Sequence, residues 1–141
     1  MIYLVKDDLI SLAVERFIDE SSEESDKILD TVELQNIQLI KGYIASRYDV
    51  SEIFNALTPI KHEILTRILT KLVLFDIIRR NAARKVPTDY KEEYDKALEL
   101  LEKIATGRIK LEGLPAPTDE NGNPTNSTSI WGNNSNPNFY I

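Results

Sequence analysis

The sequence contains no cysteine and a single histidine, His62, among its 141 residues. Disulfides, thiolate–metal sites and a cysteine nucleophile are therefore excluded, and a lone histidine makes a poor metal ligand. Only five glycines occur, and no phosphate-binding glycine loop, dinucleotide fingerprint or nucleophile elbow is found. We therefore expect no catalytic residue, no cofactor and no metal, and predict that the protein is not an enzyme.

Long apolar runs are also absent. The densest one is bounded by Lys71 and Arg79, which makes it too short to span a membrane. Residues 1–8 lack the basic segment and long apolar stretch of a signal peptide. These features predict a soluble intracellular protein with no membrane partner. The formal net charge of −6 argues against a protein that binds DNA phosphates over its whole surface.

The strongest pattern that is present runs from Pro59 to about Ala83. Its first half carries apolar residues on one broad helical face, and its second half, 72–78, is apolar except for Asp76. A helix that is apolar nearly all round is a buried one, so this segment is predicted to be the central helix. Pro59 suits its first position, and His62 is expected at the surface in its first turn. Asp76 should have a buried partner such as an arginine or a tyrosine.

Two helices are expected before the central one. The first follows a short apolar lead, with Asp7 or Asp8 as its cap and an inward face formed by Leu9, Leu12, Ala13 and Phe17. An acidic, serine-rich loop at 19–26 separates it from the second helix. That helix is predicted to begin near Asp30, which has capping-box spacing with Glu33. Its apolar stripe consists of Leu34, Ile37, Ile40, Ile44 and Tyr48.

The end of the second helix carries an unusual group of residues. Gly42 within a helix indicates close packing of a neighbouring element. Tyr43 and Tyr48 flank Arg47. Either the tyrosines pack while Arg47 pairs with a carboxylate, or Arg47 contacts a nucleic acid or another anion.

A fourth helix is predicted from Thr88, as its cap, to Gly107, as its stop. Glu92 is spaced to pair with Lys96, and Glu99 with Lys103. The stripe of this helix is formed by Tyr90, Tyr94, Ala97, Leu98, Leu101, Ile104 and Ala105. Residues 108–111 alternate and predict a short strand or an extended clamp.

From Pro115 onward the composition changes to Asn, Pro, Ser, Thr and Gly, which cannot bury a core. Residues 115–141 are either a disordered tail or an arm that orders when it docks on a partner. The arm's apolar residues, which we predict to contact a partner, are Ile130, Trp131, Phe139, Tyr140 and Ile141. A basic cluster could contact another subunit or nucleic acid, or pair with nearby carboxylates and with the carbonyls that end the central helix. It consists of Arg79, Arg80, Arg84 and Lys85.

These patterns predict an all-α fold. We expect a compact bundle of about four helices around the long central helix, with short extended segments and a long irregular C-terminal arm. Residues 1–114 would form the helical domain and residues 115–141 the arm.

The order of several motifs resembles a family of small helical proteins of Mu-like phages and prophages, related to head-to-tail connector or neck proteins. Its motifs cover most of residues 1–113, and the asparagine-rich segment after Pro115 lies outside them. The resembling motifs are Tyr3-Leu4-Val5-Lys6-Asp7-Asp8-Leu9, Gly42-Tyr43-Ile44-Ala45-Ser46-Arg47-Tyr48, Ile77-Ile78-Arg79-Arg80 and the helix from Tyr94 to Gly107.

This resemblance implies a virion protein at the portal vertex. The expected partners are further copies of the chain in a homo-oligomeric, dodecameric ring, the portal protein, adjacent neck or tail proteins, and packaged DNA in passing contact. Assembly would take place in the bacterial host cytoplasm. Two alternatives stay open. One is a helical adaptor or regulatory module that uses the basic cluster or the arm, and the other is a nucleic-acid-binding protein that uses Arg47, Arg79, Arg80, Arg84 and Lys85.

Overall fold

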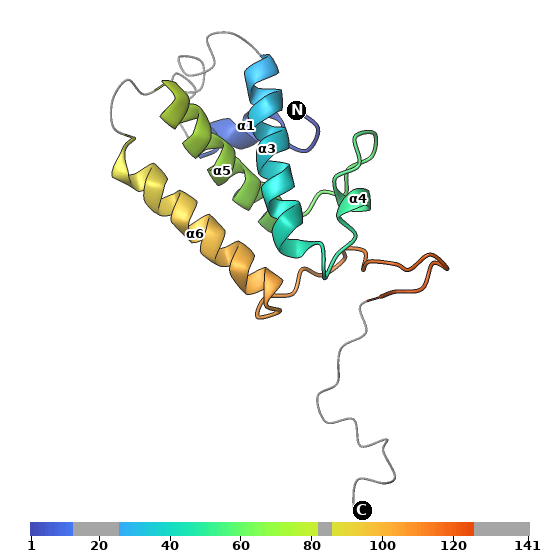
Figure 1. The fold of residues 1–141 in the computed structure, drawn as a ribbon. Coiled ribbons are helices and arrows are strands. Elements are labelled where there is room, and N and C mark those ends of the chain that lie inside the picture. Colours follow the sequence, from blue (N-terminus) through green and yellow to red (C-terminus); the bar gives the residue numbers. More distant parts are fainter. Residues whose placement is uncertain (13–25, 82–85, 126–141) are drawn as a thin grey trace, which may run out of the picture.

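The computed structural model describes residues 1–12, 26–81 and 86–125. The helices within these ranges are α1 (Lys6–Ile10), α3 (Asp26–Ile44), α4 (Val50–Ile53), α5 (Glu63–Asn81) and α6 (Thr88–Ala105). Figure 1 shows α5 running antiparallel to both α3 and α6. No strand forms in these ranges beyond an isolated bridge between Thr118 and Pro124. The prediction of an all-α bundle is confirmed.

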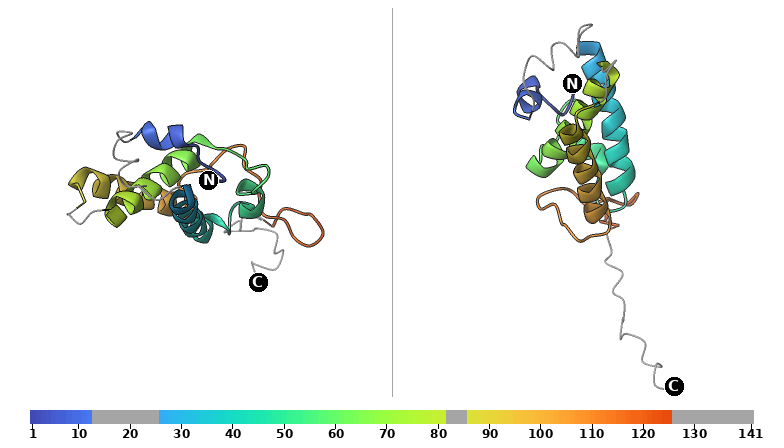
Figure 2. Two further views of the ribbon diagram at one scale, coloured as in Figure 1. Left: turned by 90° about the horizontal axis from the view of Figure 1, so that it is seen from above. Right: turned by 90° about the vertical axis from the view of Figure 1, so that its left-hand side faces the viewer.

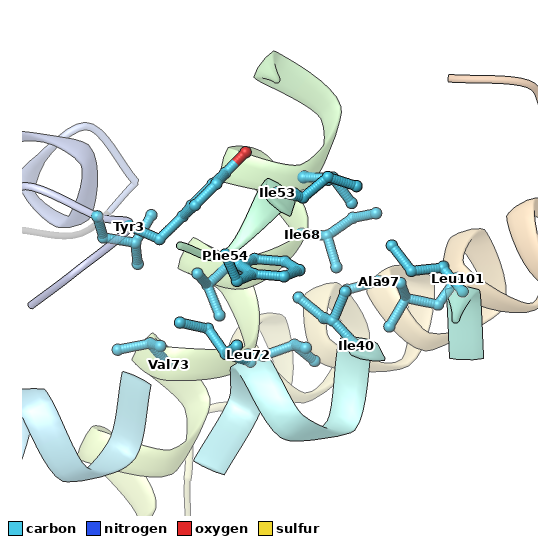
Figure 3. Packing of buried hydrophobic residues seen from close by; sticks show 14 of the residues in the cluster. Tyr3, Ile40, Ile53, Phe54, Ile68, Leu72, Val73, Ala97 and Leu101 are labelled. Atoms are coloured by element: carbon cyan, nitrogen blue, oxygen red, sulfur yellow. The ribbon is translucent and has the colours of Figure 1, made fainter. Parts of the chain in front are cut away.

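Helix α5 is the centre of the bundle. Both α3 and α6 pack against it, and α1 lies across it on another side (Figure 2). Its buried residues surround the helix axis rather than forming one stripe, as predicted from the apolar run. They are Leu65, Ile68, Leu69, Thr70, Leu72, Val73, Leu74, Ile77 and Ile78. Figure 3 shows this core where α5, α3 and α6 meet Tyr3 and the α4 segment.

The start of α5 differs from the prediction. The helix begins at Glu63, so Pro59 lies in the preceding connector rather than in its first turn. His62 precedes the helix, and its Nδ1 accepts a hydrogen bond of 3.3 Å from the Ile64 N–H. The Tyr3 hydroxyl accepts the His62 N–H at 2.8 Å and donates to the Ile60 carbonyl at 3.1 Å. His62 is therefore a partly exposed capping residue held by the N-terminal segment, and it precedes the first turn rather than lying in it.

Helix α3 begins at Asp26, four residues before the predicted start, so Asp30 lies inside it and does not cap it. Leu34 is exposed, which corrects the predicted stripe. The inward face is instead formed by Leu29, Val32, Glu33, Asn36, Ile37, Ile40 and Ile44. Gly42 is exposed, and a Cβ atom at this position would have no neighbour within 4 Å. Close packing therefore does not explain this glycine.

Glu33 does not belong to a capping box. Its side chain is fully buried and binds the N-terminal segment. Oε1 accepts hydrogen bonds from the backbone N–H groups of Tyr3 (3.0 Å) and Leu4 (2.5 Å), and Oε2 accepts one from Ile2 (2.5 Å). One carboxylate thus satisfies three backbone donors that form no helix or sheet. The apolar lead before α1 is therefore an arm packed on the core.

The ends of α1 and α6 need smaller corrections. The N-cap position of α1 is occupied by Val5, so Asp7 and Asp8 lie within the first turn rather than capping it. The Asp8 carboxylate accepts the Val5 N–H at 2.9 Å. Leu12 is exposed rather than inward. The other predicted inward residues, Ala13 and Phe17, lie outside the described residues, as does the acidic loop up to Ser25. Thr88 is the first residue of α6 rather than its cap.

Asp76 has a partner, but not the predicted arginine or tyrosine. The Asn36 Nδ2 donates to Asp76 Oδ2 at 2.8 Å and also to the Val32 carbonyl at 3.0 Å. Asn36 is buried and Asp76 is partly exposed. This pair ties α3 to α5 through a hydrogen bond to a carboxylate, which is stronger than one between neutral groups.

Candidate interaction surfaces

The root of the C-terminal arm is fixed to the end of α3. The Tyr48 hydroxyl accepts a hydrogen bond of 2.8 Å from the Leu111 N–H, and both residues are buried. Four residues further, the Pro115 carbonyl accepts the Asp49 N–H at 2.8 Å. Residues 108–111 form no strand. The chain bends at Arg108 and Ile109, and Leu111 then makes the contact with Tyr48. The chain therefore leaves the bundle from a defined point.

Arg47 joins the ends of α3 and α6. Its Nε donates to the Ala105 carbonyl at 2.7 Å, one of the carbonyls left without a partner at the helix end. Gly107 follows the end of α6 in the left-handed conformation, with a φ of +78°, so the predicted C-terminal stop of this helix is confirmed. Arg47 is half-buried beside this turn, and Tyr43 packs partly buried against the core. The sequence motif around Arg47 therefore acts within the fold and positions the arm root.

Replacing Gly107 by alanine is expected to destabilise the fold by about 2 kcal/mol. The left-handed backbone costs roughly 1–2 kcal/mol for a residue with a side chain. A Cβ would also lie 2.7 Å from the Arg47 guanidinium nitrogens. Chemical denaturation would measure the change.

Two alanine variants are matched controls for Gly107→Ala. Gly113 has a φ of +81° with open space around a Cβ, so its alanine variant should carry the backbone cost alone. Gly42→Ala, within α3, should stabilise by up to about 1 kcal/mol. Equal losses for Gly107→Ala and Gly113→Ala would show that Arg47 moves aside at no cost.

The described part of the arm, residues 115–125, folds into a small exposed turn. The Asp119 carboxylate accepts the backbone N–H groups of Asn121 (2.9 Å) and Asn123 (2.8 Å). These hydrogen bonds hold the pKa of Asp119 below its usual value, and the bond from the Asn123 N–H has the largest effect. The Thr125 N–H donates to the Pro117 carbonyl at 2.7 Å and closes the turn. Figure 1 shows this turn projecting from the bundle beyond α4.

The basic cluster starts at the opposite end of the bundle (Figure 1). Arg79 and Arg80 are exposed in the last turn of α5. Nearby, Phe75 stacks on Tyr94 of α6 with ring centroids 4.3 Å apart, and burial raises the pKa of Tyr94. The structure therefore places two of the four predicted cations on one exposed helix end. Arg84 and Lys85 lie outside the described residues.

Surface ion pairs connect α5 and α6 below this end. Lys71 of α5 contacts Glu93 of α6, and Lys96 contacts the same carboxylate at 3.1 Å. Both hydrogen bonds lower the pKa of Glu93, and the bond from Lys71 has the larger effect. Lys96 therefore pairs with Glu93 rather than with the predicted Glu92, whereas the predicted pair of Glu99 with Lys103 is present at 2.9 Å. The pairs made by Lys96 and Lys103 are exposed on both sides and contribute little to stability.

The predicted contact residues of the outer arm, Ile130, Trp131, Phe139, Tyr140 and Ile141, lie outside the described residues. Within 1–12, 26–81 and 86–125, no three Asp, Glu or His side chains are grouped as metal ligands. None of the helices in these ranges combines the length and hydropathy needed to cross a membrane. The surfaces that the structure does present are two unlike ends, one basic and one carrying the arm.

Comparison with known proteins identifies the family. The model of the family described as Bacteriophage Mu, Gp36 matches residues 3–129. The chain belongs to the bacteriophage Mu Gp36 family. It is therefore a phage protein, as the order of its motifs predicted. No curated protein and no solved structure matches the chain.

The family model extends further along the chain than the motifs that carry the resemblance. The motifs used for the resemblance ended at Gly113, with the asparagine-rich segment outside them. The Mu Gp36 family model extends to Ser129 and so includes the arm root, the Asp119 turn and the next few residues. Residues 130–141, with all five apolar residues of the outer arm, lie beyond the match.

Proposed function

We propose that this Mu Gp36 family member is a structural, non-enzymatic virion protein that forms a homo-oligomeric ring at the portal vertex. The ring would join head to tail around the DNA channel of a tailed phage or prophage. Family membership over residues 3–129 is the observation that carries the proposal. The proposed neighbours are the portal protein on one side and neck or tail proteins on the other.

The geometry of the bundle supports this role. A connector has to contact different proteins above and below its own ring, and a protomer of a ring has to offer two unlike surfaces to its neighbours. The C-terminal end of α5, whose last turn carries the exposed Arg79 and Arg80, lies at one end of the antiparallel bundle, and the arm root lies at the other (Figure 1). The acidic net charge of −6 would favour passage of DNA over its retention.

Inactivation of the gene in its phage or prophage tests the proposal. We expect filled or empty heads and complete tails that are not joined, with infectivity restored by an intact copy supplied separately. Electron microscopy of lysates would show the two structures. Normal joined particles from the mutant would contradict the proposal. A third outcome is possible, in which the mutant gives unjoined heads and tails but purified wild-type virions do not contain the protein. That outcome would contradict a ring in the particle and favour an adaptor that acts during assembly.

A further inference from the structure

The outer face of α3 differs from every other exposed helix surface in the described residues. Its exposed residues from Thr31 onward carry no charge, and the same holds in the turn that follows. They are Thr31, Leu34, Gln35, Gln38, Leu39, Gly42, Ala45 and Ser46. On α6, by contrast, every exposed residue after Thr88 is charged: Asp89, Lys91, Glu92, Asp95, Lys96, Glu99 and Glu102. The exposed residues of α5 are likewise all charged.

These residues form one continuous strip. At about 100° per residue, the eight positions fall within an arc of roughly 140°. Leu34 and Leu39 lie at its two edges and are 43% and 36% exposed. Between them lie the two glutamines and Gly42, above which a Cβ would meet nothing within 4 Å. The strip thus combines apolar rims, amide hydrogen-bonding groups and a low centre.

Removing a face of this composition from water costs little desolvation free energy, because its exposed residues are uncharged. Desolvating charged side chains is costly, and the centres of protein interfaces are accordingly depleted of charge. The glutamine amides can both donate and accept, so they could bind a backbone or the side chains of asparagine and serine. The face therefore suits an uncharged, partly aromatic polypeptide segment.

The chain itself contains such a segment. No Asp, Glu, Lys, Arg or His follows Glu120, and the last 16 residues, 126–141, combine asparagines and serines with Trp131, Phe139 and Tyr140. Aromatic residues of this kind dominate binding at interfaces. Fully extended, 16 residues reach about 53 Å. Helix α3, with 19 residues, is about 28 Å long. The segment could cover α3 and still bridge two copies.

We propose that the strip on α3 binds residues 126–141 of a neighbouring copy of the chain. The inference rests on the proposed ring, which requires a donor and an acceptor surface on each protomer. The arm is anchored by Pro115 beside the end of α3, and its turn at 118–124 projects from the bundle (Figure 1). Repeating this one contact from copy to copy generates a closed ring or an open chain.

Single cysteines test the contact, because the natural chain has none. Chains with Gln38→Cys would be mixed with chains carrying Ser135→Cys, oxidised, and analysed by non-reducing electrophoresis and mass spectrometry. We expect a disulfide-linked pair that contains both peptides. Glu92→Cys, on the charged face of α6, replaces Gln38→Cys in the control mixture and should give less than one tenth of that product.

A chain that carries both Gln38→Cys and Ser135→Cys separates the two possible origins of the segment. Linked oligomers support the proposal, whereas a linked monomer at every concentration would show that each chain covers its own α3 and would overturn it. No linkage in either format would also overturn it. The two proposals can fail separately. If the disulfide forms between copies but inactivation of the gene leaves heads and tails joined, the contact is upheld and the connector function is refuted.

Charge introduced into the strip supplies a second readout. The double variant Gln35→Lys/Gln38→Lys changes the net charge by two units, as does Glu92→Lys on α6. We expect the former to reduce assembly at least tenfold and the latter to leave it within twofold, with both variants folded by circular dichroism. Equal assembly of the two folded variants would overturn the proposal.

Discussion

Replacing Glu33 by alanine should cost the fold about 3 kcal/mol, because its carboxylate anchors the N-terminal segment. The carboxylate is fully buried and accepts the N–H groups of Ile2, Tyr3 and Leu4. Its removal leaves those donors without a partner, at a cost of about 1–3 kcal/mol for each buried one, offset by the relief of a desolvated charge. In a domain of this size the melting temperature would fall by roughly 10 °C.

Glu33→Gln is the matched control. Its single amide oxygen could still accept from Tyr3 and Leu4, which share Oε1, while its NH₂ group would face the Ile2 N–H. About half of the loss is therefore expected. Release of residues 1–4 in the alanine variant would also be visible as faster hydrogen exchange at these amides. A loss below about 0.5 kcal/mol for alanine would refute the assignment of Glu33 as their anchor.

Leu72→Ala is expected to destabilise the protein by about 2–5 kcal/mol. Leu72 lies on α5 with no exposed surface, within the cluster that joins α5 to α3, α4 and α6 (Figure 3). Truncation removes buried methyl groups and leaves a cavity that three packed helices cannot readily close. Urea denaturation would measure the difference.

Leu57→Ala provides the comparison for Leu72→Ala. Leu57 lies in the connector before α5 and is 91% exposed, so the same chemical change should alter stability by no more than about 0.5 kcal/mol. Similar losses at both positions would contradict a core centred on α5.

The helices that could be predicted from the sequence are those in which the spacing of apolar residues indicates a buried face. Helices α5 and α6 have long apolar patterns. The structure buries the centre of each pattern, such as Leu72 and Leu101, and leaves other members, such as Tyr90 and Leu98, partly exposed. Their starts could not be predicted in the same way. The start of α5 depends on His62 and on the Tyr3 hydroxyl, which is 59 positions away in the chain.

Glu33 shows a limit of local rules. Its spacing from Asp30 fits a capping box, which is a common meaning for a glutamate at that distance. It also lies four residues after Leu29 and four before Ile37, on the inward stripe. That spacing was a signal that Glu33 would be buried. The identity of its partners could not follow, because the Ile2–Leu4 backbone carries no side-chain signature.

The structure shows where some of the residues predicted to form surfaces lie. Arg79 and Arg80 are exposed as an interface would need, whereas Arg47 binds the Ala105 carbonyl within its own fold. The sequence allows two kinds of partner for Arg47, a carboxylate or an external anion, because it does not show which helix end would lie beside this residue. The apolar spacing of the second helix places Leu34 on its inward face, so the sequence does not reveal the uncharged strip of α3, where Leu34 is exposed.

Electron microscopy of the purified protein mixed with the portal protein of the same phage tests the central claim most directly. The proposed connector predicts an added ring of density on one end of the portal, with the symmetry of the protein's own ring. Mass measurement should show many copies per portal. A portal that looks unchanged, with this protein remaining at the mass of a single 16.1 kDa chain at every concentration, would contradict it.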